Sequence, residues 1–394
     1  MKKRMKCSAK NIRTTFFGCD VCFSPSQYVV KLEMNSNRQN MIKKLRWAYP
    51  WVLPPFIVSA PMRVMAGPEL AVAVSRAKGL GFIGPNPKIE DQSQDLEQAR
   101  KLLSSAPDSP SQADFQSLAA DRALPVGVGF QIWDSNMDLV ISVVKKHQPC
   151  AAWLFAPRNG QEEVNNWTSS IRNVSPNTQI WLQVGTLREA ITATQSKDRP
   201  DVLVIQGSEA GGHGRAVDGT SIMTLFPEVA DNIRDSGIPL LAAGGIADGR
   251  GVVAALGLGA AGIIMGTRFL AAKETRISKG YQQEIVRATD GGVTTTRTMI
   301  YNHLRGTMGW PEQFSPRGLI NKSFIEHQAG VPFEKLQALY EDAAKTGDSG
   351  WGPEGRLATY AGTAVGLVKS VDGAGDIVKQ TREEASDIIK SLTI

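Results

Sequence analysis

The stretch from Pro239 to Lys273 constrains the fold of this chain more than any other part of the sequence. It reads as two buried strands, each closed by a glycine turn, with one amphipathic helix between them and Asp248 as the helix N-cap. Two parallel strands joined by a helix make a βαβ unit, in which both turns leave the carboxyl ends of neighbouring strands. Glycine lets backbone N–H groups approach an anion closely, so we expect the two turns to bind one phosphate. The alternative is that both turns serve only tight packing.

Eight short apolar runs of strand type occur between residues 56 and 266, with helical segments between them. Most are uninterrupted rather than alternating, which is typical of parallel strands covered on both faces. The runs are Phe56–Ala60, Leu80–Gly84, Val126–Phe130, Ala151–Phe155, Gln179–Val184, Val202–Gln206, Pro239–Ala243 and Gly262–Gly266. Eight alternating units predict an α/β fold, a (β/α)8 TIM barrel. An open doubly wound sheet is the competitor, but its GxGxxG fingerprint after the first strand is absent.

The pattern divides the 394 residues into four parts. Residues 1–46 form a basic leader, which we expect to be disordered or a loosely attached arm. Residues 47–273 hold the barrel, and residues 274–355 form a smaller domain inserted after strand eight. Residues 356–394 are predicted to contain two helices that close the barrel, Leu357–Val368 and Asp376–Leu392.

The leader accounts for the net charge of +6, because its 11 Lys and Arg face only two acidic residues, while the rest of the chain holds 33 basic and 36 acidic ones. A nearly neutral body argues against nucleic-acid binding, and the absence of a long apolar run argues against a membrane span. Three of the four cysteines lie in the leader, so we expect a core without disulfides and an intracellular, most simply cytoplasmic, location. A mitochondrial presequence is another interpretation of the leader, and a mis-called translation start, with Met34 or Met41 as the real one, is a third. The Cys19–Cys22 CxxC is interpreted as a chance pair, with a zinc or redox site as the alternative.

The residues that follow the strands are the candidates for chemistry, because barrel active sites lie at the carboxyl ends of the strands. His213 is the strongest, since it lies in a glycine-flanked loop after strand six and imidazole titrates near neutrality. Glutamines and glycines at these ends suit hydrogen bonds to a heteroaromatic ring. With one phosphate site and no dinucleotide fingerprint, FMN is the economical cofactor. No HExxH, His–carboxylate cluster or GxSxG supports a metal or a serine nucleophile.

Several segments together closely resemble the nitronate monooxygenase family, formerly called 2-nitropropane dioxygenases. The resemblance covers Tyr49–Phe269 well and is looser over 275–355. It is carried by Ala60-Pro61-Met62, Leu80–Gly84, Gln206–His213, Ala242–Gly251 and Met265–Phe269. It implies an FMN-containing barrel that oxidises alkyl nitronates, such as propionate 3-nitronate, with O2 to a carbonyl compound and nitrite. The partners are then a small-molecule substrate and O2, with the oligomeric state left open.

The resemblance also assigns roles to residues of this chain. His213 would take a proton from a nitroalkane or hold the nitronate. The phosphate turns would be Gly244, Gly245, Gly266 and Thr267, and the flavin ring would lie near Pro61, Met62, Gln183, Gln206, Gly211 and Gly212. The open alternatives are an NAD(P)H-dependent flavin reductase acting on a quinone or enoyl thioester, a specialised biosynthetic flavin oxidoreductase, and a flavin-binding protein without turnover.

Overall fold

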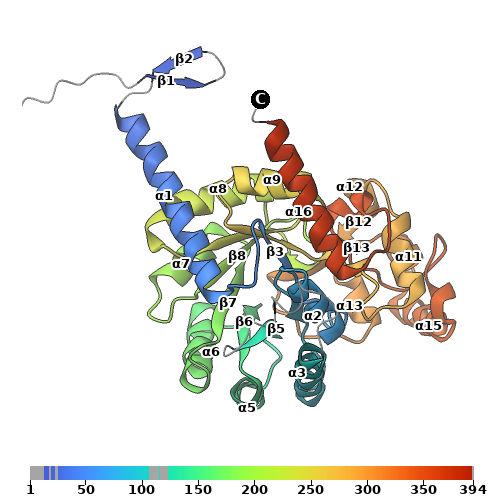
Figure 1. The fold of residues 1–394 in the computed structure, drawn as a ribbon. Helices are drawn as coiled ribbons and strands as arrows, with labels where there is room; N and C mark the ends of the chain where they lie inside the picture. Colours follow the sequence, from blue (N-terminus) through green and yellow to red (C-terminus); the bar gives the residue numbers. More distant parts are fainter. Residues whose placement is uncertain (1–12, 17–18, 23–24, 106–114, 116–122, 393–394) are drawn as a thin grey trace, which may run out of the picture.

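The computed structural model describes residues 13–16, 19–22, 25–105, 115 and 123–392, with side chains described from residue 37 onward. Its centre is a barrel of eight parallel strands, as the sequence predicts (Figure 1). The strands are β3 (Phe56–Ser59), β4 (Phe82–Ile83), β5 (Leu124–Gln131), β6 (Pro149–Phe155), β7 (Gln179–Val184), β8 (Val202–Gln206), β10 (Leu240–Ala243) and β11 (Gly262–Met265). They pair in the order β3-β11-β10-β8-β7-β6-β5-β4, and a parallel bridge between Val58 and Leu80 joins the two end strands. The predicted (β/α)8 barrel is therefore confirmed.

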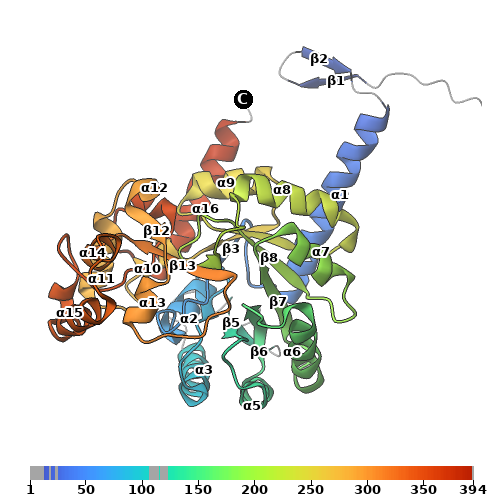
Figure 2. The same ribbon diagram turned by 180° about the vertical axis from the view of Figure 1, so that it is seen from behind.

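Seven helices follow the strands in alternation and cover the barrel from outside (Figure 2). They are α2 (Pro68–Arg76), α3 (Ile89–Ser104), α5 (Met137–His147), α6 (Gly160–Val174), α7 (Leu187–Gln195), α8 (Ile222–Asn232) and α9 (Gly249–Gly257). Asp248 caps α9 as expected, since its carboxylate accepts from the backbone N–H groups of Arg250 and Gly251. Strands such as β10 are buried along their whole length, because side chains pack both inside the barrel and against these helices.

The C-terminal helix α16 (Ala374–Ser391) lies between α9 and α2 and completes the ring of helices. The carboxylate of Glu384 accepts from the N–H of Gly249 at 3.0 Å, and Arg382 donates to the carbonyl of Lys78 at 2.9 Å. The predicted helix over Leu357–Val368 is wrong, because only the 3-10 turn η3 (Thr363–Leu367) forms there. The N–H of Gly362 instead donates to the hydroxyl of Thr267 at 2.9 Å, so this segment serves the barrel mouth.

Aromatic side chains fill the barrel interior and close its amino-terminal end. The rings of Trp153 and Trp181 stack with centroids 5.8 Å apart, and Phe82 packs edge-on against Trp153. The indole N–H of Trp181 donates to the hydroxyl of Tyr49 at 2.7 Å, which ties the barrel interior to the end of the first long helix. Phe115 packs against Trp51 at this same end. A cavity opens at the other end of the barrel, toward the carboxyl ends of the strands.

The segment between β11 and α16 builds a cap on the barrel mouth. Strands β12 (Thr295–Arg297) and β13 (Phe314–Leu319) form an antiparallel sheet with β9 (Gly212–Arg215), which follows barrel strand β8. His213 pairs with Pro316 in this sheet. Six α-helices complete the segment, namely α10 (Thr267–Leu270), α11 (Lys279–Arg287), α12 (Gly291–Thr294), α13 (Ile300–Leu304), α14 (Lys322–Gln328) and α15 (Phe333–Lys345). The pairing of β9 with β13 ties this segment to the loop that carries the candidate catalytic histidine.

The leader differs from its prediction over the part that the structure describes. Pro25–Ala48 form the helix α1 rather than an irregular arm, after the short strands β1 (Arg13–Phe16) and β2 (Cys19–Cys22). Leu45 is 1% exposed, and the ammonium of Lys44 donates to the carbonyl of Gly237 at 2.6 Å, so the end of α1 packs on the barrel. The predicted disorder of residues 1–12 and the side chains of the CxxC lie outside the described part of the chain.

Candidate active site

A cavity of about 350 Å³ opens at the carboxyl ends of the barrel strands. Every site residue predicted from the sequence lines it, namely Pro61, Met62, Gln183, Gln206, Gly211, Gly212, His213, Gly244, Gly245, Gly266 and Thr267. These residues come from five different strand ends, and closure of the barrel brings them to one place. The structure thus supplies the common site that the sequence pattern predicts, without assigning their roles.

The two glycine turns lie side by side because β10 and β11 pair, with Ala243 beside Ile264. Gly244 and Gly245 adopt φ values of 96° and 73°, in the left-handed region that favours glycine. A Cβ on Gly244 would lie 3.1 Å from the backbone nitrogen of Ala210. The backbone N–H groups of Gly244, Gly245 and Gly266 donate to no acceptor within the described residues. They are therefore free for a ligand.

Arg297 from β12 holds the glycine-rich loop in place. Its guanidinium donates to the carbonyls of Ser208, Ala210 and Gly212, at 3.2, 3.2 and 3.3 Å. Burial lowers the pKa of Arg297 to about 10, with the neighbouring charge of Arg317 acting in the same direction. The guanidinium of Arg297 therefore provides hydrogen-bond donors for three carbonyl groups of this loop.

The imidazole of His213 lies between an indole and an amide. Its ring stacks on that of Trp310, with centroids 3.5 Å apart and planes 8° from parallel. Its Nε2 lies 2.8 Å from Nδ2 of Asn302. Burial lowers the pKa of His213 to about 3, and the positive charges of Arg297, Arg63 and Arg305 contribute to the lowering. The ring is therefore neutral across the physiological range.

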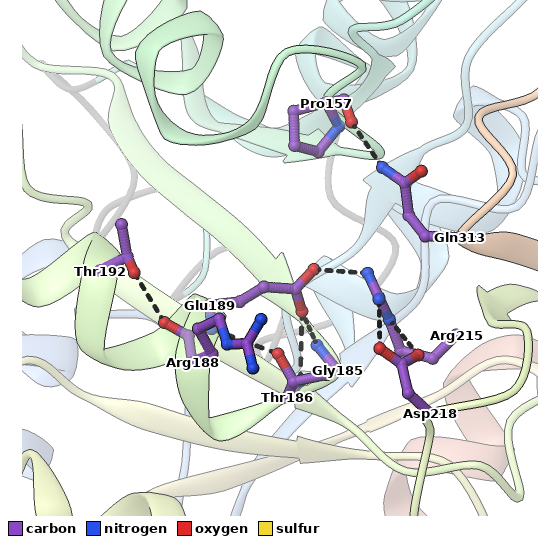
Figure 3. Close-up of polar contacts among 9 residues, drawn as sticks. All are labelled: Pro157, Gly185, Thr186, Arg188, Glu189, Thr192, Arg215, Asp218 and Gln313. Carbon is purple, nitrogen blue, oxygen red and sulfur yellow. Dashed lines mark hydrogen bonds and ion pairs between the residues drawn. The ribbon is translucent and has the colours of Figure 1, made fainter.

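A second set of contacts anchors the strand that carries His213 (Figure 3). The guanidinium of Arg215 donates to Oε1 of Glu189 at 2.9 Å and pairs with Asp218. The other carboxylate oxygen of Glu189 accepts from the N–H groups of Gly185 and Thr186, at 2.8 and 3.1 Å, which caps helix α7. One carboxylate therefore links the barrel, at the strand end after Gln183, to the strand β9.

The cap segment provides further contacts that hold β9 in place. The side-chain amide of Gln313 donates to the carbonyl of Pro157 at 3.2 Å (Figure 3). The backbone carbonyl of Gln313 accepts from the N–H of Ala216 at 2.9 Å. Residue 313 directly precedes β13. The strand that carries the imidazole is thus held by contacts to two barrel loops.

Sequence reasoning gave no role to five residues that line the cavity, namely Arg63, Asn302, Arg305, Trp310 and Tyr360. Arg63 stands among the candidates that directly follow the first strand, but it was assigned no role. The other four come from the cap segment, where no periodic pattern relates them to a strand end. His147, on α5 outside the cavity, is 1% exposed, and its Nε2 lies 2.8 Å from the hydroxyl of Ser93.

Comparison with known proteins decides the family. The family model for nitronate monooxygenase matches residues 49–308. This chain belongs to the nitronate monooxygenase family. The relatives of this chain include npaC of Metarhizium robertsii, named as a nitronate monooxygenase, which is 58% identical over 91% of this chain and 97% of its own length. A nitronate monooxygenase of Neurospora crassa is 35% identical, over 90% of this chain and 95% of its own.

Comparison with solved structures confirms the fold of this chain. A structure described as nitroalkane oxidase from Streptomyces ansochromogenes superimposes with a TM-score of 0.65 at 21% identity, and covers 89% of this chain and 99% of its own. Family membership makes the protein a flavin-dependent oxidoreductase that acts on nitronates. Within the described ranges, no helix is long and apolar enough to cross a membrane, and no cluster of His, Cys, Asp or Glu could hold a metal ion.

Proposed function

We propose that this protein binds FMN and uses it to oxidise nitronates that carry a carboxylate, such as propionate 3-nitronate, with O2 to a carbonyl compound and nitrite. The observation that carries the proposal is that the two glycine turns, the strand-end glutamines and His213 line one cavity. The names of the relatives in Metarhizium robertsii and Neurospora crassa support a nitronate as the substrate.

The two glycine turns fit the phosphate of a mononucleotide. Unpaired N–H groups on Gly244, Gly245 and Gly266 can converge on an anion, as phosphate sites at strand ends require. The hydroxyl of Thr267 accepts from Gly362 and retains its own proton for donation. These groups would hold the FMN phosphate.

The strand-end glutamines offer complementary groups for a heteroaromatic ring. Oε1 of Gln183 accepts from the indole N–H of Trp153 at 3.1 Å, which leaves its NH2 group to donate into the cavity. Nε2 of Gln206 donates to the carbonyl of His213 at 3.3 Å, which leaves its Oε1 as the acceptor. The edge of an isoalloxazine ring carries both acceptors and donors, so the pair would orient it.

Two arginines make the cavity suitable for an anionic substrate. Arg63 and Arg305 both line it, and Arg63 forms no hydrogen bond or ion pair with any other residue in the described part of the chain. Burial lowers the pKa of Arg63, and the positive charge of Arg305 contributes, so an anion between them would be favoured. A nitronate with a second, carboxylate charge uses both arginines, whereas a simple alkyl nitronate uses one.

The redox chemistry would come from the flavin, which when bound accepts electrons from the nitronate and passes them to O2. The chain supplies the rest. His213 and the arginines hold the anionic substrate, the glutamines orient the ring, and the cap segment with Trp310 covers the site and limits the access of water.

Purification followed by an absorption spectrum and mass identification of the released cofactor tests the FMN proposal. Nitrite release and O2 consumption with propionate 3-nitronate test the reaction. A colourless protein that does not bind FMN contradicts the proposal. Rapid anaerobic bleaching of the flavin by NADPH, without bleaching by the nitronate, would instead support a reductase.

The carboxylate specificity is tested with Arg63→Met. We expect the KM for propionate 3-nitronate to rise about tenfold, the effect of losing one charge-assisted hydrogen bond, while the KM for ethyl nitronate changes less. Arg63→Lys retains the charge and should show a smaller effect. Equal increases in KM for both substrates would show that Arg63 does not recognise the carboxylate.

A further inference from the structure

The imidazole of His213 is held by a chain of hydrogen bonds that reaches it from the cap segment. Nδ2 of Asn302 lies 2.8 Å from Nε2 of the ring, and the hydroxyl of Tyr360 donates to Oδ1 of Asn302 at 3.0 Å. Asn302 is 1% exposed, so its amide is buried away from bulk solvent. The amide can satisfy both neighbours in only one orientation.

The direction of this chain is set at its far end by Arg305. A guanidinium can only donate, and that of Arg305 lies 5.6 Å from the centre of the Tyr360 ring, so it offers the hydroxyl of Tyr360 no acceptor. The single hydroxyl proton of Tyr360 is then directed to Oδ1 of Asn302. The NH2 group of Asn302 consequently donates to His213, and Nε2 of the ring must accept.

A neutral imidazole with Nε2 as acceptor carries its proton on Nδ1. The ring is neutral because burial, together with the charges of Arg297, Arg63 and Arg305, lowers its pKa to about 3. No carboxylate among the described residues pairs with the ring to oppose these three cations.

The other ring nitrogen faces the cavity. Nδ1 of His213 has no hydrogen-bond partner among the residues whose side chains are described. Several buried polar atoms in this part of the chain also have no partner, but Nδ1 of His213 is not among these buried atoms. It therefore reaches accessible space, and the space beside the ring is the cavity that His213 lines. An N–H donor is thus presented where the substrate would lie.

We propose that Asn302 and Tyr360 are positioning residues that fix His213 as a hydrogen-bond donor, so that its Nδ1–H binds a negatively charged oxygen of the substrate and takes no proton from carbon. This inference rests on the proposed function and restricts the proposed substrate to the preformed nitronate. A nitronate arrives without its α-proton and needs a donor, whereas a neutral nitroalkane needs a base. The arrangement of Asn302 therefore selects the preformed nitronate anion.

The first experiment measures the tautomer and needs no catalysis. The chain has four histidines, so nitrogen NMR of protein labelled with 15N-histidine, compared with His213→Gln, identifies the signals of His213. We expect a proton on Nδ1 in the unmodified protein and a proton on Nε2 in Asn302→Asp, because a carboxylate can only accept. A proton on Nε2 in the unmodified protein would overturn the proposal.

The second experiment compares a nitronate with its parent nitroalkane. In Asn302→Asp, Nδ1 becomes a base, so we expect the ratio of kcat/KM for nitronate over nitroalkane to fall at least about tenfold. Tyr360→Phe should lower the ratio less, since it only releases the amide. Asn232→Asp, a charge change on the exposed face of α8, is the matched control and should leave the ratio unchanged.

The two experiments separate this inference from the proposed function. An unchanged ratio in Asn302→Asp, with flavin content and circular dichroism retained, contradicts the inference alone. Failure of the unmodified protein to oxidise any nitronate contradicts the proposed function, while the NMR experiment still decides the tautomer of His213.

Discussion

The indole of Trp310 lies flat on the imidazole of His213, with ring centroids 3.5 Å apart and planes 8° from parallel. Trp310 is 7% exposed and belongs to a small aromatic cluster with Phe155 and Phe314 above the barrel mouth. One face of the imidazole is thereby covered by an apolar ring. This contact joins the cap segment to the loop that carries His213, and it helps to keep the imidazole free of water and neutral.

Removing the indole should restore water to that face. In Trp310→Ala we expect the pKa of His213 to rise from about 3 toward its ordinary value near 6.5, as a histidine titration followed by NMR would show. Trp310→Phe retains a ring face and should change the pKa less. An unchanged pKa of His213 in Trp310→Ala would mean that residues other than Trp310 exclude water from the imidazole.

The phosphate turn can be tested with a pair of glycines. Gly244 and Gly259 have φ values of 96° and 101°, so alanine at either position should cost about 1–2 kcal/mol of stability. Only Gly244 lies at the cavity, where a Cβ would meet the backbone of Ala210, whereas a Cβ on Gly259 meets nothing within 4 Å. We therefore expect FMN retention, measured by flavin fluorescence titration, to weaken about tenfold or more in Gly244→Ala only. Equal FMN affinity in both variants would exclude the turn as the phosphate site.

The link between α7 and β9 predicts a catalytic effect from outside the cavity. Glu189→Gln retains an acceptor for the N–H of Gly185 but loses the charge that holds Arg215. We expect kcat/KM for the nitronate to fall several-fold while the melting temperature changes little, because His213 is two residues from Arg215. Asp342→Asn removes a fully exposed ion pair with Lys345 and is the control, expected to affect neither quantity. A fall in melting temperature without a change in kcat/KM would make the contact purely structural.

The low pKa of His213 also predicts a pH dependence of stability. The unfolded chain binds a proton at this histidine below about pH 6.5, whereas the folded protein does so only near pH 3. Stability contributed by the neutral ring is therefore complete above pH 6.5 and is lost as the pH falls toward 3. Between pH 7 and pH 5, the free energy of unfolding should fall about 2 kcal/mol more in the unmodified protein than in His213→Gln. Parallel curves from denaturant titrations would contradict the lowered pKa.

The barrel and much of its site could be predicted from the sequence for a simple physical reason. Buried parallel strands need uninterrupted apolar runs, and tight turns at their ends need glycine, so both leave local patterns. The turns after β10 and β11 and the loop before His213 were found in this way. The helix expected over Leu357–Val368 failed because Gly362 and Thr363 use their backbone groups in contacts with the distant residues Thr267 and Glu209.

The sequence by itself determined which residues stand at the strand ends, since each position follows from a local strand-and-turn pattern. Only the tertiary structure decided what surrounds His213, because Asn302, Trp310 and Tyr360 are between 89 and 147 residues away along the chain. They reach the ring through the pairing of β9 with β13, and the pairing partner of an edge strand leaves no local signal. The state of the imidazole, neutral and donating from Nδ1, depends on those distant neighbours.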